Sequence, residues 1–171
     1  MAKSKNVSVA DIDFLDELAC TNTALRLAAR RLGMLYDDAF AEVGLKSTQV
    51  SLLAEIDRLA SGNDGVPPTV QDLSAKLAIQ ISAVTHALRP LVRDRLVELR
   101  PHEQDGRAKR VALTSTGMTR LREAHGRWTE ANNRVEKVLG PKSASQLRAL
   151  ADRVSSDEFL VAYDKARAQE R

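Results

Sequence analysis

The feature of this sequence that most constrains its fold is a short stretch of period-two hydrophobicity set between long stretches of helical period. Apolar side chains recur at every second position over residues 97–100 and again over residues 110–113. The segment His102–Lys109 between them contains Asp105-Gly106, a pair that favours a tight hairpin turn. We therefore predict a two-stranded antiparallel β-ribbon with a basic tip in a chain that is otherwise helical.

On both sides of this ribbon, apolar residues recur at steps of three and four, as in amphipathic helices. The pattern predicts, in chain order, a helix over Asp11–Val43, a helix capped by Ser47 or Thr48, a short helix opened by a capping box at Thr69–Asp72, a helix from about Ile81, a helix over Thr114–Leu139, and a last helix opened by a capping box at Ser143–Gln146 with Leu147, Leu150 and Val154 facing inward. We expect Gly33 to bend the first helix, Pro90 to kink the fourth, and the tail Lys165–Arg171 to fray.

Positive charge is concentrated in the middle of the chain. The 171 residues carry 26 Lys and Arg against 23 Asp and Glu, a net charge of +3. Residues 76–110 alone hold eight cations against four acids, a net +4, so the rest of the chain is slightly acidic. Such a segment suggests contact with a polyanion, most simply nucleic acid, although a solvated basic surface would look the same.

Several classes of protein are disfavoured. No apolar run approaches the ~18 residues that cross a bilayer, so we expect no membrane association. The N-terminal residues lack the apolar core of a secretory signal, and the single Cys20 cannot form an internal disulfide, so we expect a cytoplasmic protein. The sequence contains no H-E-x-x-H, C-x-x-C, Gly-rich phosphate loop or G-x-S-x-G, and its three histidines are scattered. We therefore expect no enzyme, no cofactor and no metal site.

The predicted order of three helices, a break, a helix and a ribbon is that of a winged helix-turn-helix. The residues resemble the MarR (multiple antibiotic resistance regulator) family of dimeric transcription factors over roughly residues 11–165. The wing, Asp105–Gly117, matches the family pattern D-x-R-x-x-x-V-x-L-T-x-x-G throughout. The segment Leu88–Val97 is similar to the end of the family's recognition helix, and Gly44–Gln49 to the turn before its second helix.

The resemblance also has departures. Arg95 stands where the family usually has Gly, and Gln80-Ile81 lacks the frequent Asp-Arg pair at the start of the recognition helix. These differences bear on which DNA sequence is preferred rather than on DNA binding itself. The resemblance implies dimerisation helices over 11–45, a DNA-binding lobe over 46–114, and C-terminal helices over 115–165 that complete the dimer.

The resemblance further implies the residues that meet double-stranded DNA. Base edges would be contacted from the early turns of the recognition helix, a phosphate by Arg89, and the minor groove by the wing. The expected DNA-binding residues are Ser82, Ala83, Thr85, His86, Arg89, Asp105, Arg107 and Lys109. Each of these residues has a plainer alternative role. Ser82 and Thr85 could cap the helix or be exposed to solvent, and His86 is a contact on the helix surface rather than a proton switch. Asp105 and Arg107 could form only a salt bridge within the turn.

Cys20 suggests a second, competing mode of control. Organic hydroperoxide sensors of the family use an N-terminal cysteine bonded to tyrosines of the partner subunit, and Tyr36 could be one such residue, whereas Ser47 occupies the second position. No cation lies within two positions of Cys20, so we expect a buried structural thiol.

The sequence thus predicts a homodimeric repressor of a pseudopalindromic operator, released by a small-molecule effector whose pocket it does not identify. The alternatives are a redox-sensing regulator acting through Cys20 and a helical interaction module that does not bind DNA.

Overall fold

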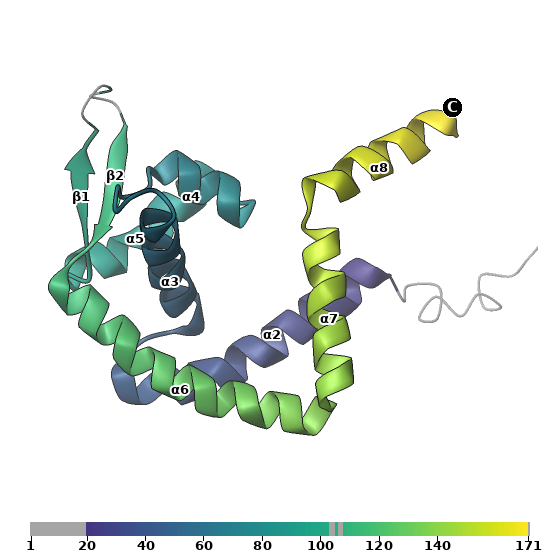
Figure 1. Ribbon diagram of the computed structural model, residues 1–171, viewed down its shortest axis with the longest axis horizontal. Coiled ribbons are helices and arrows are strands. Elements are labelled where there is room, and N and C mark those ends of the chain that lie inside the picture. The colour runs from purple at the N-terminus through teal and green to yellow at the C-terminus, as the bar shows by residue number, and fades with distance from the viewer. Residues whose placement is uncertain (1–19, 103–104, 106–107, 171) are drawn as a thin grey trace, which may run out of the picture. The chain divides into compact units, whose positions relative to one another are not determined.

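Helices dominate the fold, and one antiparallel ribbon accompanies them. The computed structural model describes residues 20–102, 105 and 108–170 of the chain. In chain order the described elements are α2 (Thr21–Phe40), the 3₁₀-helix η2 (Ala41–Val43), α3 (Ser47–Ser61), α4 (Val70–Leu77), α5 (Ile81–Arg93), β1 (Val97–Pro101), β2 (Lys109–Leu113), α6 (Ser115–Leu139), α7 (Pro141–Val154) and α8 (Asp157–Gln169) (Figure 1). The predicted fold class, mostly α with a small β-ribbon, is confirmed.

The chain divides into two compact units, the first ending at Ala124 and the second running from His125 to Arg171. Helix α6 contributes to both units. No helix among the described residues is both long and apolar enough to cross a membrane.

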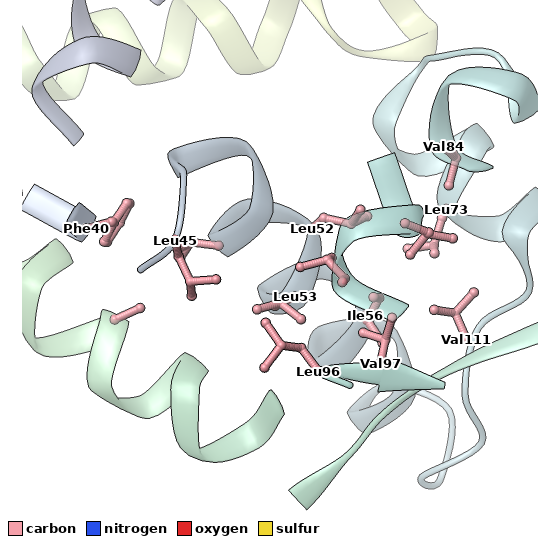
Figure 2. Close-up of a cluster of buried hydrophobic side chains, with 14 residues drawn as sticks. Phe40, Leu45, Leu52, Leu53, Ile56, Leu73, Val84, Leu96, Val97 and Val111 are labelled. Atoms are coloured by element: carbon pink, nitrogen blue, oxygen red, sulfur yellow. The ribbon is translucent and has the colours of Figure 1, made fainter. Parts of the chain in front are cut away.

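Three helices and the ribbon supply most of the core of the first unit. Buried side chains of α3 meet those of α4, α5, β1 and β2 in one cluster, shown in Figure 2. Its fully buried members include Leu53, Ile56, Leu73, Leu91 and Val111. Each such side chain contributes about 1.5–3 kcal/mol when it leaves water. This cluster therefore holds α5 and the ribbon in a fixed position relative to α3 and α4.

The ribbon has the predicted antiparallel pairing. Val97 lies opposite Leu113, and Leu99 lies opposite Val111. The loop before α4 is attached to the ribbon by a single β-bridge, in which Thr69 pairs with Arg110 and the Val111 amide donates to the Pro68 carbonyl at 2.8 Å. The sequence pattern did not predict this bridge.

The N-terminal helix differs in detail from its prediction. Cys20 caps α2, which runs unbroken through Gly33, and residues 11–19 of the expected helix lie outside the described residues. Gly44 adopts a left-handed conformation with φ +68° where η2 ends, as its position predicts.

The predicted caps had mixed outcomes. The capping box at Thr69 is confirmed, since its amide donates to the Asp72 carboxylate at 2.8 Å and its Oγ1 accepts the Asp72 amide at 3.1 Å. The Ser47 or Thr48 cap was wrong, because Ser47 is already the first residue of α3. Its amide instead donates to Asp37 Oδ1 of α2 at 2.6 Å. Helix α5 continues through Pro90 to Arg93.

The second unit departs most from the prediction. Helix α7 begins at Pro141 rather than Ser143, because proline at the first helical position has its backbone preset and lacks only an amide that would be unpaired there. Helix α8 was not predicted, and residues 165–169 belong to it rather than to a frayed tail. In α7 the buried side chain is Ala144, whereas Leu147, Leu150 and Val154, expected to face inward, are exposed in the single chain.

Candidate nucleic-acid interface

One face of α5 is buried and the opposite face is open to solvent. Val84, Leu88 and Leu91 point into the core. The exposed positions include all the sequence-predicted residues of this helix: Ser82, Ala83, Thr85, His86 and Arg89. Spacings of three and four place residues 82, 85, 86 and 89 on one face. The early turns of α5 therefore present hydroxyl, methyl and imidazole groups on one exposed surface, followed by a guanidinium.

The hydroxyl of Thr85 is partly committed to its own helix. Its Oγ1 donates to the Ile81 carbonyl at 2.8 Å, as threonines inside helices often do. The oxygen keeps lone pairs that can accept a further hydrogen bond. A contact between Thr85 and an external group would therefore use the hydroxyl as an acceptor or use its methyl group.

A groove of about 630 Å³ separates α5 from the ribbon. Its wall on the helix includes Thr85 and Arg89, and its wall on the ribbon includes Leu99 and Lys109. The N-terminal turn of α4, starting at Thr69, borders it as well. Residues that lie 10 to 24 positions apart in the sequence thus line the same groove.

The cations around this groove differ in how far they are already neutralised. Arg93 makes two hydrogen bonds to the Asp94 carboxylate, at 2.8 and 3.1 Å, and the guanidinium holds the pKa of Asp94 below its usual range. Arg100 pairs with Glu98. Among the described residues, Arg89 and Lys109 have no acidic partner. Arg89 and Lys109 are therefore the groove cations best placed to meet an anion.

The tip of the ribbon is only partly described. Asp105 is exposed, and its amide donates to His102 Nδ1 at 3.2 Å. Arg107 lies outside the described residues, as does the expected pairing of Arg107 with Asp105.

Arg110 has a position that sequence reasoning missed. Its Nη1 donates to the Pro67 carbonyl at 2.8 Å, and its Nη2 lies 3.1 Å from His102 Nε2. Strand alternation was one signal for this position, because neighbouring residues of a strand point to opposite faces and Arg110 therefore faces away from Lys109.

Cys20 does not match the expected buried thiol. It is exposed in the single chain, its Sγ lies 3.0 Å from Thr23 Oγ1 and it accepts the Thr23 amide at 3.4 Å. These hydrogen bonds from Thr23 lower the pKa of Cys20. The partner of the thiol stands three positions ahead, at the distance over which a helix cap acts, and not among the neighbours within two positions. Tyr36 stacks on Phe40 about four turns further along α2.

Comparison with known proteins identifies the fold. No family model and no curated protein sequence matches the chain. Among solved structures, M. tuberculosis MosR in complex with DNA is 30% identical, with a TM-score of 0.66 over 79% of this chain and 96% of that chain. A mutant MarR from E. coli complexed with operator DNA has a TM-score of 0.73 at 20% identity, over 85% and 100% of the two chains. The S. aureus MepR–DNA complex has a TM-score of 0.66 at 20% identity, over 79% and 96%.

The likeness to MarR and MepR shows the winged helix-turn-helix fold, in which α4 and α5 form the helix-turn-helix and the β1–β2 ribbon forms the wing. The identity to MosR over nearly its whole length extends this likeness to the sequence. The chain therefore belongs to the MarR family of DNA-binding transcriptional regulators.

Proposed function

We propose that this regulator is a homodimeric repressor that binds a pseudopalindromic operator through α5 and the wing, and that a small-molecule effector releases it. One observation carries the DNA-binding part of the proposal. Thr85 and Arg89 on the exposed face of α5 line the same groove as Lys109 of the wing, and the two cations have no acidic partner among the described residues. A helix beside a cationic hairpin matches a major groove with its flanking phosphates.

The proposal gives each residue of the interface a role. Ser82, Ala83, Thr85 and His86 meet base edges in the major groove, because they occupy the early turns of α5. Arg89 and Lys109 contact phosphates. Arg107 enters the minor groove, oriented by Asp105.

Dimerisation is supported by apolar side chains that the single chain leaves uncovered. On α2, Leu27 is 60% and Met34 is 62% exposed, and on α8, Leu160 is 58% and Tyr163 is 60% exposed. Side chains of this kind, at this density, call for a partner surface. We assign the helices of 11–45 and 115–165 to the dimer and 46–114 to the DNA-binding lobe. Two-fold symmetry then sets the recognition helices ~34–36 Å apart, on successive major grooves.

Effector control is supported by the family relationship. A ligand that binds one arrangement of the two DNA-binding lobes more tightly shifts the dimer toward that arrangement. The DNA is released when the distance between the two recognition helices in that arrangement no longer fits the operator. Deletion of the gene should raise transcription of its target, which separates a repressor from an activator.

Fluorescence anisotropy tests the DNA-binding proposal. The probe is the duplex that the wild-type protein protects in a footprint of DNA upstream of its own gene. Arg89→Ala should weaken binding to all duplexes to a similar degree and flatten the log–log salt dependence by about 0.9, the value of one phosphate contact. The matched control is Arg122→Ala, an exposed cation of α6 that does not line the groove. Once sedimentation shows that this variant has the same mass in solution as the wild type, it should leave both quantities unchanged.

Other outcomes would contradict the proposal in different ways. Loss of operator preference in Arg89→Ala, with non-specific binding intact, would show that Arg89 reads bases. A wild-type protein that binds no duplex in a salt-dependent way would favour the helical interaction module. Sedimentation at micromolar concentration should give about twice 18.8 kDa, and a monomer that still binds the operator would exclude the proposed symmetry.

A further inference from the structure

A continuous series of polar contacts joins the wing to the loop in front of α4. It starts at the Pro67 carbonyl, which accepts from Arg110 Nη1 at 2.8 Å. Arg110 Nη2 lies 3.1 Å from His102 Nε2, and His102 Nδ1 lies 3.2 Å from the amide nitrogen of Asp105, close to the wing tip. Four residues that are up to 43 positions apart in the sequence are therefore linked through two side chains.

The backbone is fastened at the same place. The Val111 amide donates to the Pro68 carbonyl at 2.8 Å, and Thr69 bridges to Arg110. These bonds hold the middle of β2, whereas the Arg110–His102 contact reaches from β2 across to the residue that follows β1. The side chains thus extend the attachment from the middle of β2 toward the tip of the wing.

Arg110 lies on the face of β2 opposite the groove. Neighbouring residues of a strand point to opposite faces, and Lys109 and Ala108 line the groove whereas Arg110 does not. Arg110 is also half-buried, with its guanidinium against the Pro67 carbonyl. Its guanidinium is therefore directed toward the loop before α4 rather than toward a ligand in the groove.

The chemistry of this site suits arginine and a neutral histidine. A guanidinium is a planar fork that can donate to two acceptors at once, which the single ammonium of lysine does with less directional control. A neutral imidazole has one acceptor nitrogen, so His102 accepts either from Arg110 through Nε2 or from the Asp105 amide through Nδ1, depending on its tautomer. In both tautomers the ring fills the space between β2 and the tip.

We propose that Arg110 and His102 are positioning residues, which hold the wing against the loop before α4 and so set how its tip approaches DNA, without contacting DNA themselves. This inference rests on the proposed role of the wing in operator binding. Arg110, although a cation in the basic segment, then acts through geometry and not through its charge.

Charge-conserving and acceptor-conserving variants test this inference on the full-length dimer, with the footprinted duplex as the anisotropy probe. Arg110→Lys should weaken operator binding about tenfold although the net charge is unchanged, because a point charge replaces a two-pronged donor. His102→Ala should weaken binding similarly. His102→Gln should restore most of the loss, since the amide oxygen of glutamine can accept from Arg110. In a protein that already carries His102→Ala, the added change Arg110→Lys should weaken operator binding only slightly further.

Two sets of results would overturn the inference. Wild-type affinity in Arg110→Lys, with loss in Arg110→Met, would show that Arg110 contacts phosphate through its charge. Equal losses of operator affinity in His102→Gln and His102→Ala, or additive losses in the double variant, would show that Arg110 and His102 do not act as a pair. Thermal unfolding and sedimentation of each variant distinguish a loss of wing position from a loss of fold.

Wing variants separate this inference from the function on which it rests. If Arg107→Ala and Lys109→Met leave operator affinity unchanged, the proposed contact of the wing with DNA is wrong. If these two variants weaken binding while Arg110→Lys and His102→Ala do not, the wing contacts DNA and only the positioning role is wrong.

Discussion

The backbone of Gly117 lies directly against that of Leu96, so that a Cβ atom on Gly117 would sit 1.9 Å from the Leu96 carbonyl oxygen. Thr114 tightens the same junction. Its Oγ1 donates to the Arg95 carbonyl at 2.7 Å and accepts the Gly117 amide at 2.9 Å, and its amide donates to the Leu96 carbonyl at 3.1 Å. Helix α6 therefore begins on the turn that joins α5 to β1, which explains physically why this chain has L-T-x-x-G at the end of its wing segment.

Gly117→Ala should destabilise the protein by about 3 kcal/mol, because the methyl group meets backbone that cannot move aside without disturbing β1. Gly126 in the same helix is the matched control. A Cβ there meets nothing within 4 Å, so Gly126→Ala should stabilise α6 by about 0.5–1 kcal/mol. Urea unfolding of both variants measures the two effects, and an unaffected Gly117→Ala protein would contradict the close approach.

Arg95→Gly should raise the stability by about 0.5–1 kcal/mol. Arg95 adopts φ +57° in a Schellman motif at the end of α5, where its amide donates to the Val92 carbonyl at 3.0 Å and the Leu96 amide to the Leu91 carbonyl at 2.8 Å. A left-handed residue with a Cβ costs about 1 kcal/mol, which glycine avoids. Arg95→Ala, which removes the charge but keeps the Cβ, should show no such gain at the same protein concentration.

Asp37 should make part of the stability pH-dependent. The hydrogen bond from the Ser47 amide holds the pKa of Asp37 below its usual range, and Lys46 at 3.6 Å adds to this effect. A carboxylate with a lowered folded-state pKa stabilises the fold above its unfolded-state pKa, and this contribution is lost as the pH falls through the lower folded-state value.

The variant Asp37→Asn isolates this contribution. It should be less stable than the wild type by about 1 kcal/mol at neutral pH, the size of a helix-cap contribution, and the difference should shrink below about pH 4 as Asp37 is protonated. Chemical unfolding at a series of pH values measures it. A difference that stays constant with pH would mean that the Ser47 amide does not need a charged acceptor.

Arg107→Ala should weaken operator binding by about 1–3 kcal/mol, with the largest loss on sites whose flanks are A·T-rich, because a guanidinium enters a narrow minor groove readily. Asp105→Ala should also weaken binding if Asp105 orients Arg107, whereas charge counting predicts tighter binding. Anisotropy on one operator decides between these signs. Tighter binding by Asp105→Ala would show that the wing acts only as an electrostatic patch and that Asp105 does not orient Arg107.

Cys20 should react with iodoacetamide faster than an unperturbed exposed thiol, because the Thr23 hydrogen bonds lower its pKa and favour the thiolate. Thr23→Val removes the side-chain bond and should slow the reaction. Cys20→Ser should nevertheless leave operator binding and effector release intact. A Cys20→Ser protein that binds DNA but no longer responds to peroxide would establish redox control instead.

The elements that could be predicted are those whose signals are local in the sequence. The alternation around Asp105-Gly106 predicted the ribbon, because its two strands lie within 17 residues of chain and a turn signal stands between them. The Thr69–Asp72 capping box could be predicted for the same reason. The exposed face of α5 followed from the spacing of its apolar residues, which determines the side that solvent reaches.

Competing local signals account for the errors at the C-terminal end. Pro141 and Ser143 are both good helix starts, and the helix begins at the earlier one, where proline occupies the first helical position. Helix α8 has a weak apolar stripe, so its hydrophobic pattern did not separate it from a tail.

By itself, then, the sequence determined most of the helical segments before α8, the presence of the ribbon, and which cations surround it. Only the tertiary structure decided what those groups contact. Asp37 meets the first turn of α3 and Arg110 meets the Pro67 carbonyl because the core brings their elements together, and neither partner is encoded by any spacing along the chain. The difference has a physical reason: periodicity fixes the direction of a side chain relative to its own element, whereas its partner depends on how the buried faces of several elements pack.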